Sequence, residues 1–412
     1  MITNRNLKRS GFSRLSFSRD HMYIISRVFT FLLSLVFALI YSKNLGLEAR
    51  GLLTFFMVGN LIFSILLISG FSLSLRNSSS TSNLDARLGS YLSYSFLVSF
   101  TTPILVFISR EIYDKIYQTA LPNNLLLTIT IYCFLATLMF ALHDALLLID
   151  SLKLISLLDL CIVLIQIATY FFLLTIGETS GFVSVMLSIS FSYSVAIFSI
   201  LFLLAYVYRP RFRISKSLWG EFLKSGKTLT FSIIVSGLTD RLDKIYLGLQ
   251  SATADLGRYS TNQSLVSWSR AVPEAMTKIS TLRRKSFFII GRANLSSLIL
   301  LFTTALLLSY FLQRTVLLYL GPAWAVSLPI LFGLVFIELF RGLVQLGTND
   351  LIRFRKYKNL RFIAGIQLLL LFTLQPWAIR AHGVSGAIFS ILLIYFVSGA
   401  LIWRVSRSNS FG

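Results

Sequence analysis

Residues 240–244 read Asp240-Arg241-Leu242-Asp243-Lys244 and lie inside an apolar stretch, 228–250, that is long enough to cross a membrane. An ionisable side chain at the centre of a bilayer costs about 2.5–3.5 kcal/mol on insertion scales. A helix with four such side chains is therefore expected to face a water-filled cavity and not lipid. This expectation favours a transport protein over a scaffold or a surface enzyme.

The next apolar stretch, 258–282, also has a polar side. At 3.6 residues per turn, the polar residues of each stretch fall on one stripe of its helix. The first stripe holds Ser232, Ser236, Asp240, Asp243 and Lys244, with Arg241 at its edge, and the second holds Ser260, Ser264, Ser267, Glu274 and Lys278, with Arg270 beside it. Two such stripes would form one wall of an aqueous cavity. The alternative is internal neutralisation, because Asp240 with Lys244 and Arg270 with Glu274 have the i, i+4 spacing of helical ion pairs.

The composition of the whole chain is that of a membrane protein. Of its 412 residues, 55% are hydrophobic and 13% are charged, against about 25% charged in ordinary soluble proteins. A helix needs about 20 residues to cross the hydrocarbon core, and about twelve stretches qualify: 22–41, 51–75, 88–108, 125–149, 154–175, 182–208, 228–250, 258–282, 296–313, 325–347, 362–379 and 383–403. Backbone groups in lipid must be satisfied within their own segment, so the sequence predicts an all-α polytopic membrane protein. Pro103, Pro273, Pro329 and Pro376 fall within these stretches and are expected to kink them.

The formal net charge of +22 is explained by topology. Lys and Arg gather in alternate connections, which is the positive-inside pattern. The most basic connections, 209–227 and 353–361, both fall on the predicted cytoplasmic side, as do both termini. A role for these connections in binding anionic lipid or a cytoplasmic partner is an alternative, but no nucleic acid partner is expected.

A repeat appears at half the length of the chain. Leu45-Gly46-Leu47-Glu48-Ala49-Arg50-Gly51-Leu52 follows the first segment, and Ser251-Ala252-Thr253-Ala254-Asp255-Leu256-Gly257-Arg258-Tyr259 follows the seventh. Aligning Gly51 with Gly257 gives an offset of about half the chain, with six segments in each half. An even number gives both halves the same orientation, so the sequence predicts a parallel repeat around a central cavity. The expected division is a cytoplasmic segment 1–21, an N-lobe 22–208, a basic inter-lobe loop 209–227, a C-lobe 228–403 and a cytoplasmic tail 404–412.

The same residues carry a family resemblance. The run from Arg27 through Tyr41 to Leu53 resembles the opening of polysaccharide exporters, and the run 240–248 with 256–260 resembles the start of their second half. These are the O-antigen flippases of the multidrug/oligosaccharidyl-lipid/polysaccharide exporter superfamily. The resemblance implies a flippase without covalent chemistry, in the bacterial inner membrane. It also implies alternating access, undecaprenyl-pyrophosphate-linked oligosaccharide as the substrate, and a polysaccharide polymerase and a chain-length regulator as partners.

The ionisable residues inside the segments are the candidate substrate site. The primary candidates for lining the cavity are Arg27, Asp240, Arg241, Asp243, Lys244, Arg270 and Glu274; the secondary candidates are Asp144, Asp159, Glu338 and Arg341. Arg27 lies near the inner end of its segment, so it either contacts the pyrophosphate or extends to the interface. Asp159 has no partner on its own helix and is expected to meet one from another. Glu338 and Arg341 are one turn apart and are expected to pair.

Two other functions stay open. A drug/cation antiporter of the same superfamily would have a smaller, less basic cavity. An O-antigen polymerase or ligase is also polytopic, but the longest predicted external loop, 109–124, leaves little room for a catalytic surface. The cysteines and histidines are scattered, so neither a metal nor another cofactor is expected. The coupling ion, H⁺ or Na⁺, is left open.

Overall fold

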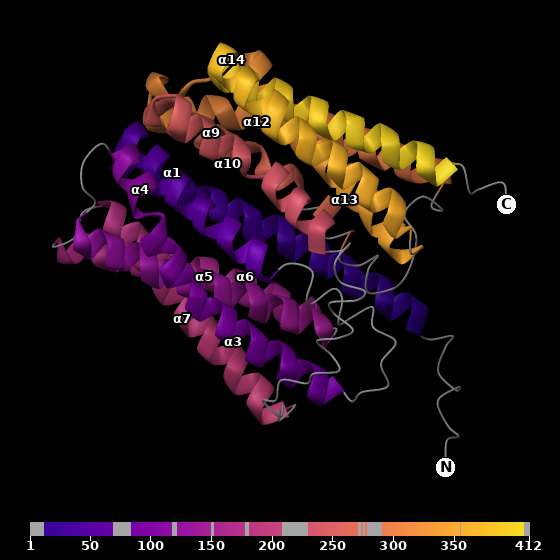
Figure 1. The fold of residues 1–412 in the computed structure, drawn as a ribbon, viewed down its shortest axis with the longest axis horizontal. Helices are drawn as coiled ribbons and strands as arrows, with labels where there is room; N and C mark the ends of the chain where they lie inside the picture. Colours follow the sequence, from indigo (N-terminus) through magenta and orange to yellow (C-terminus); the bar gives the residue numbers. More distant parts are fainter. Residues whose placement is uncertain are drawn as a thin grey trace.

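A computed structural model describes residues 12–68, 84–117, 122–149, 152–177, 181–207, 230–270, 273–274, 277, 291–354 and 356–407. All regular structure in these ranges is helical (Figure 1). The predicted inter-lobe loop 209–227, the first eleven residues of the N-terminal segment and residues 408–412 of the tail lie outside the described residues, as do 69–75 and 278–282 at the ends of two predicted segments.

Helix α1 (Phe12–Ile68) contains the first two predicted segments. A straight helix would hold Tyr23 and Ile68 about 68 Å apart at 1.5 Å per residue, yet both belong to one buried apolar cluster. The chain therefore folds back on itself, and it does so at Gly46, whose φ of 77° and ψ of 174° are not helical. Glycine adopts a positive φ without a steric penalty, so the short turn needs no further loop.

Helix α14 (Tyr357–Arg407) is a second hairpin, and it contains the last two predicted segments. It turns at Gly383 (φ 55°), and its two ends meet again where Lys356 Nζ donates to the carbonyl of Val405 at 3.5 Å. Gly177 and Gly321 also have positive φ and follow α6 and α12. We call the end of the bundle that holds Gly46, Gly177, Gly321 and Gly383 the turn end.

The helices form two lobes, drawn in Figure 1 as an indigo-to-magenta half and a red-to-yellow half. The N-lobe comprises α1, α3 (Leu84–Ile108), α4 (Arg110–Tyr117), α5 (Asn123–Leu148), α6 (Leu152–Ile176) and α7 (Gly181–Val207). The C-lobe comprises the short helix Thr230–Thr239, α9 (Leu242–Gln250), α10 (Thr253–Val266), η1 (Ser267–Arg270), α12 (Gly291–Leu320), η2 (Pro322–Trp324), α13 (Leu328–Arg353) and α14. Helix α1 of the N-lobe and helix α10 of the C-lobe pack against each other where the two lobes meet.

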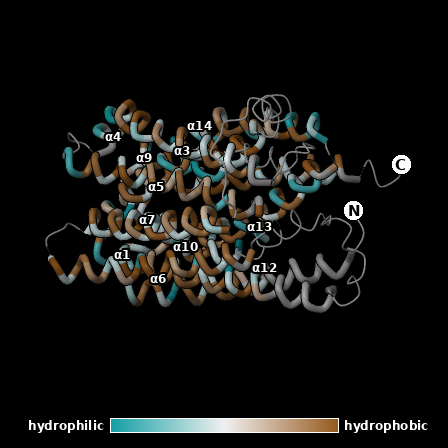
Figure 2. The backbone as a smooth tube through the Cα atoms, turned by 90° about the horizontal axis from the view of Figure 1, so that it is seen from below, coloured by the Kyte–Doolittle hydropathy of each residue, from teal (hydrophilic) through white to brown (hydrophobic). Residues whose placement is uncertain are grey.

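Eight of the described helices are long and apolar enough to cross a membrane. Two of them, α1 and α14, each contain two predicted segments. The seventh and eighth predicted segments, which are shorter or more polar, complete the predicted twelve, so the twelve-segment, two-lobe architecture is confirmed. Figure 2 shows hydrophobic residues along most of these helices. Many large apolar side chains point outward, including Phe198 and Leu318, as expected for a surface that faces lipid.

Three predicted segments differ from the structure in detail. The seventh was expected to be continuous over 228–250, but it breaks at Asp240 and Arg241 before α9 begins at Leu242. The eighth begins earlier than expected, at Thr253, and tightens into the 3-10 turn η1 after Val266. Pro329 does not kink the tenth segment, because α13 begins at Leu328 and places this proline in its first turn, where its missing N–H costs nothing.

The predicted repeat is visible as a symmetric contact between the lobes, near the turn end. A Cβ atom added to Gly51 would lie 1.9 Å from the carbonyl oxygen of Thr253, and one added to Gly257 would lie 2.0 Å from that of Leu47. The Thr54 hydroxyl donates to Ser260 at 2.9 Å, across the same offset of 206 residues. Residues related by the repeat therefore meet at the axis between the lobes. We call this contact the glycine crossing.

Candidate substrate-binding site

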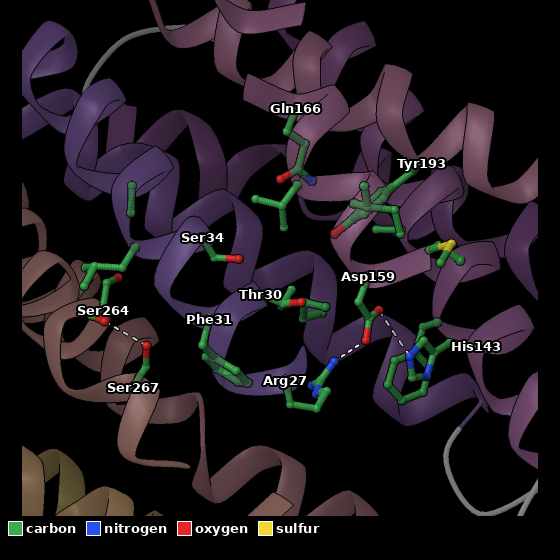
Figure 3. A pocket seen from close by; sticks show the side chains of 18 of the residues that line it. Arg27, Thr30, Phe31, Ser34, His143, Asp159, Gln166, Tyr193, Ser264 and Ser267 are labelled. Carbon is green, nitrogen blue, oxygen red and sulfur yellow. Dashed lines mark hydrogen bonds and ion pairs between the residues drawn. The ribbon is translucent and has the colours of Figure 1, made fainter. Parts of the chain in front are cut away.

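A cavity of about 490 Å³ lies between the two lobes. The N-lobe helices α1, α5, α6 and α7 contribute most of its lining, and the C-lobe contributes Ser264, Ser267 and Arg270 (Figure 3). On the first limb of α1, before Gly46, the lining residues are Arg27, Thr30, Phe31, Ser34, Leu35, Ala38 and Tyr41, and the second limb adds Leu61. The spacing of the first-limb residues places them on one face of that limb. The cavity therefore follows α1 over about 21 Å, from Arg27 to Tyr41.

Arg27 links the two lobes beside this cavity. It is 9% exposed and pairs with the carboxylate of Asp159 on α6. Its other amino group donates to Glu274 of the C-lobe at 2.8 Å. On the far side of Asp159, His143 Nε2 of α5 lies 3.4 Å from the second carboxylate oxygen. The predicted partner of Asp159 from another helix is thus Arg27.

Arg270 approaches the carboxylate of Glu274 from the side opposite Arg27. Its Nε lies 3.7 Å from Glu274 and 3.9 Å from Glu338 on α13. The guanidinium groups of Arg27 and Arg270 lie 5.4 and 5.8 Å from the centroid of the Phe31 ring. Two cations from different lobes therefore share one aromatic ring and one carboxylate at the edge of the cavity.

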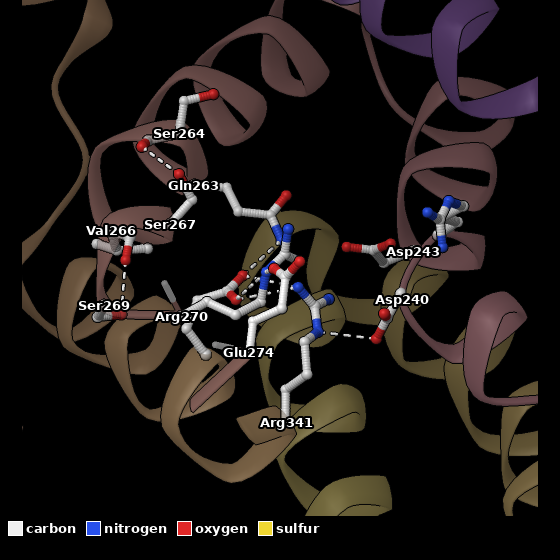
Figure 4. A network of polar contacts seen from close by, with 12 residues as sticks. Asp240, Asp243, Gln263, Ser264, Val266, Ser267, Ser269, Arg270, Glu274 and Arg341 are labelled. Atoms are coloured by element: carbon white, nitrogen blue, oxygen red, sulfur yellow. Dashed lines mark hydrogen bonds and ion pairs between the residues drawn. The ribbon is translucent and has the colours of Figure 1, made fainter. Parts of the chain in front are cut away.

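Arg341 of α13 extends the network away from the cavity (Figure 4). It is 3% exposed and pairs with Glu338 at 2.9 Å, as predicted, but also with Asp240 at 2.8 Å. The hydroxyl of Tyr395 on α14 accepts from Arg341 Nε at 3.1 Å and donates to Asp240. Asp240 is thereby held by α13 and α14 at the break in the seventh segment.

Together these contacts form a continuous row of alternating charges from one lobe to the other. The row runs through Asp159, Arg27, Glu274, Arg270, Glu338, Arg341 and Asp240. Each member has an oppositely charged neighbour, which offsets the cost of removing these groups from water.

The other charges of the seventh segment lie differently from the predicted cavity wall. Asp243 is fully buried, pairs with Lys244 at 3.2 Å and accepts from the Tyr259 hydroxyl at 2.6 Å. Arg241 donates to the carbonyl of Gly237. Of the described residues that line the cavity, none comes from the seventh segment. The role of Asp240, Arg241, Asp243 and Lys244 in substrate binding stays a prediction.

The two predicted i, i+4 pairs have different outcomes. Arg270 and Glu274 do pair. Lys244, in contrast, donates to the backbone carbonyl of Asp240 and forms its ion pair with Asp243. Among the secondary candidates, Asp159, Glu338 and Arg341 join the row of charges, whereas Asp144 is not one of the residues that line this cavity.

Several lining residues were not among the sequence candidates, namely Phe31, His143, Gln166 and Tyr193. The signal that could have found them is the helical spacing from Arg27 on α1 and from Asp159 on α6, which places Phe31 and Gln166 on the same faces. Guanidinium groups at the edge of a cavity suit a phosphate-bearing ligand, because each offers forked N–H donors. Within the described residues no group of His, Cys, Asp or Glu could hold a metal ion.

Substitution of Arg270 and Glu274, singly and together, separates substrate binding from internal pairing. We expect Arg270→Ala to lower export at least tenfold with nearly unchanged protein abundance, because its partly exposed side chain faces the cavity. If the pair is purely structural, each single variant loses abundance and the double variant regains both abundance and export. Full export by the double variant would remove Arg270 from the substrate path.

Comparisons with known proteins agree with this architecture. Residues 21–272 match the family described as "Polysaccharide biosynthesis protein". No curated protein sequence matches the chain with significance.

Among solved structures, a ligand complex of the MATE multidrug transporter DinF-BH is similar to this chain with a TM-score of 0.66 at 14% identity, covering 99% of this chain and 98% of that one. The lipid II flippase MurJ in an inward closed conformation has a TM-score of 0.65 at 12% identity, covering 94% and 87%. An inward-facing MATE family transporter of the MOP superfamily has a TM-score of 0.60 at 12% identity, covering 93% and 97%.

The family match spans the N-lobe and the start of the C-lobe, and the structural similarity spans nearly the whole chain. By this match the protein belongs to the polysaccharide biosynthesis protein family, and it shares its fold with these transporter structures.

Proposed function

We propose that the protein moves a polyprenyl-pyrophosphate-linked oligosaccharide, such as an O-antigen repeat unit, from the inner to the outer leaflet of the bacterial inner membrane. The observation that carries this proposal is the pair Arg27 and Arg270, which approach one carboxylate from opposite lobes at the edge of the cavity. A diphosphate is a stronger acceptor for these two guanidinium groups than a single carboxylate. It would therefore displace Glu274 and bring both lobes into contact with the substrate.

Two of the contacts between the lobes support alternating access. The glycine crossing joins the lobes at the turn end, and the Arg27–Glu274 pair joins them nearer the opposite end. The polyprenyl tail would remain in lipid while the sugar head crosses through the cavity. Release of one contact while the other holds would open the cavity to one side at a time.

A drug/cation antiporter is the second candidate. The observation that favours it is that Asp159 lines the cavity and that Glu274 pairs with the lining residues Arg27 and Arg270, since carboxylates bind organic cations. The similarity to MATE transporter structures also favours it. The two readings differ in the charge of the substrate. Binding of inorganic pyrophosphate by the purified protein supports the first, and binding of a cationic dye without pyrophosphate binding supports the second.

Cells that lack the protein test the proposed function directly. We expect them to accumulate lipid-linked single repeat units on the inner leaflet, because the head group cannot cross without the cavity. A polymerase or ligase defect would leave units or chains accessible from the periplasm. Finding the accumulated material on the periplasmic side would overturn the flippase assignment. A polymerase and a chain-length regulator are the proposed partners, and the coupling ion stays open between H⁺ and Na⁺.

We also propose the orientation that the basic connections predict, with both termini cytoplasmic and the turn end periplasmic. Reporter fusions after residues 215 and 356 should report cytoplasm, and a fusion after residue 180 should report periplasm. Residues 215 and 356 on opposite sides of the membrane would contradict the parallel repeat.

A further inference from the structure

Arg50 is a buried arginine that the row of charges does not include. It lies in the second limb of the α1 hairpin, next to Gly51, and is 5% exposed. Its guanidinium lies 4.7 Å from the centroid of the Tyr41 ring. One amino group donates to the Ser264 hydroxyl at 3.5 Å, and its Nε has no hydrogen-bond partner.

The contrast with the other buried arginines is clear. Arg27 and Arg341 each pair with two carboxylates. Arg50 has no carboxylate within 4.0 Å among the residues that the structure describes. Because an arginine side chain does not lose its proton in proteins, this charge stays buried, and among the described residues an aromatic face and one hydroxyl compensate it. A buried guanidinium whose N–H donors are not all used can bind an anion through charge-assisted hydrogen bonds.

Both partners of Arg50 line the central cavity. Tyr41 and Ser264 belong to its lining, so Arg50 lies directly behind the cavity wall. Tyr41 is fourteen residues further along α1 than Arg27, which is about 21 Å at 1.5 Å per residue. Arg50 therefore stands at the turn end of the cavity, and Arg27 with Arg270 stands at the other.

Opening of the turn end would expose this side chain. Arg50 precedes Gly51 in the N-lobe, whereas Ser264 follows Gly257 on α10 of the C-lobe. Separation of the glycine crossing pulls these two residues apart, which breaks the contact between Arg50 and Ser264. The amino group of Arg50 that donated to Ser264 then has no acceptor and is free to bind a ligand in the cavity.

We propose that Arg50 is a second anion site, which holds the diphosphate of the substrate when the cavity is open at the turn end. Arg27 and Arg270 receive the head group when the cavity is open at the opposite end, and Arg50 takes it over before release. This inference rests on the proposed function, because it takes the substrate head to be a phosphate ester.

The test uses the full-length protein in lipid nanodiscs with inorganic pyrophosphate as the probe. The Gly257→Ala background keeps the turn end apart, because the added methyl group cannot fit against Leu47. In that background we expect Arg50→Gln to weaken pyrophosphate binding at least tenfold and Arg50→Lys to weaken it about threefold. Lys43→Gln is the matched control, since Lys43 is an exposed cation near the same end, 4.3 Å from the Tyr319 ring centroid, and it should change binding less than twofold.

The outcomes separate the two proposals. If Arg27→Gln abolishes binding in the native chain while Arg50→Gln changes it less than twofold in both backgrounds, Arg50 only braces the hairpin and the second site is overturned, while the proposed function stands. If no form of the protein binds pyrophosphate, both proposals fall.

A second measurement does not need the Gly257→Ala background, so it tests the proposal even if that variant fails to fold. In the native background, Arg50→Gln should slow export per molecule at least tenfold at unchanged melting temperature, and Arg50→Lys should recover at least a third of the rate. Export by Arg50→Gln within twofold of the native rate would overturn the second site.

Discussion

Gly257→Ala is expected to reduce export at least tenfold. A Cβ atom at this position would lie 2.0 Å from the carbonyl oxygen of Leu47, and the backbone cannot yield as a flexible side chain would. The two helices must therefore separate by more than about 1 Å, which removes the close packing that holds the crossing. The turn end then cannot close, and alternating access stops. Export of lipid-linked units per molecule of protein is the measurement.

Gly365→Ala is the matched control. Gly365 lies in α14, and nothing lies within 4 Å of its added Cβ atom, so export should stay within twofold of the native rate. The repeat also predicts that Gly51→Ala matches Gly257→Ala, because its Cβ atom would lie 1.9 Å from Thr253. If Gly51→Ala and Gly257→Ala both export at the native rate, the glycine crossing does not have to close during transport.

Arg27→Ala is expected to have the second large effect, on both stability and export. Removing the guanidinium leaves Asp159 and Glu274 without their shared partner, and breaking a buried ion pair costs about 3–5 kcal/mol. We expect a lower melting temperature and loss of export by at least a hundredfold, because the lobes lose one of their contacts and the diphosphate loses its N-lobe cation. Arg314→Ala is the control, since this exposed arginine donates to Tyr310 away from the cavity.

The double variant Arg27→Gln/Glu274→Gln separates the loss of stability from the loss of export. It removes a cation and an anion together, so much of the stability should return. Export should not return, because the substrate still lacks Arg27. Recovery of export to within twofold of the native rate would mean that Arg27 acts only as a structural link between the lobes.

Much of the fold was predictable from local properties of the chain. Apolar length sets where a segment crosses the membrane, since backbone groups in lipid must be satisfied by the helix itself. The repeat was visible as one matched pair of loops, and the contact between Thr54 and Ser260 has the same offset. The break at Asp240 was not predicted, because it depends on Arg341 and Tyr395, which are far away in sequence.

The candidate site was predictable in its residue types but not in its pairing. A buried ionisable group needs a partner, so the sequence predicted that Asp159 meets one from another helix and that Arg270 could pair with Glu274. For Arg27 it left open a contact with the pyrophosphate or extension to the interface. It could not identify Arg50, whose position at the end of a predicted loop gave no sign of burial.

The sequence by itself determined the membrane class, the number of crossings and the doubled architecture, because hydropathy and segment length act residue by residue. Only the tertiary structure decided which carboxylate each arginine meets, that Asp240 pairs with Arg341 and not with Lys244, and that Gly51 and Gly257 touch. Ion pairs and close helix contacts depend on distances of a few ångströms between segments that are remote in the chain, and such distances are set by packing of the whole bundle.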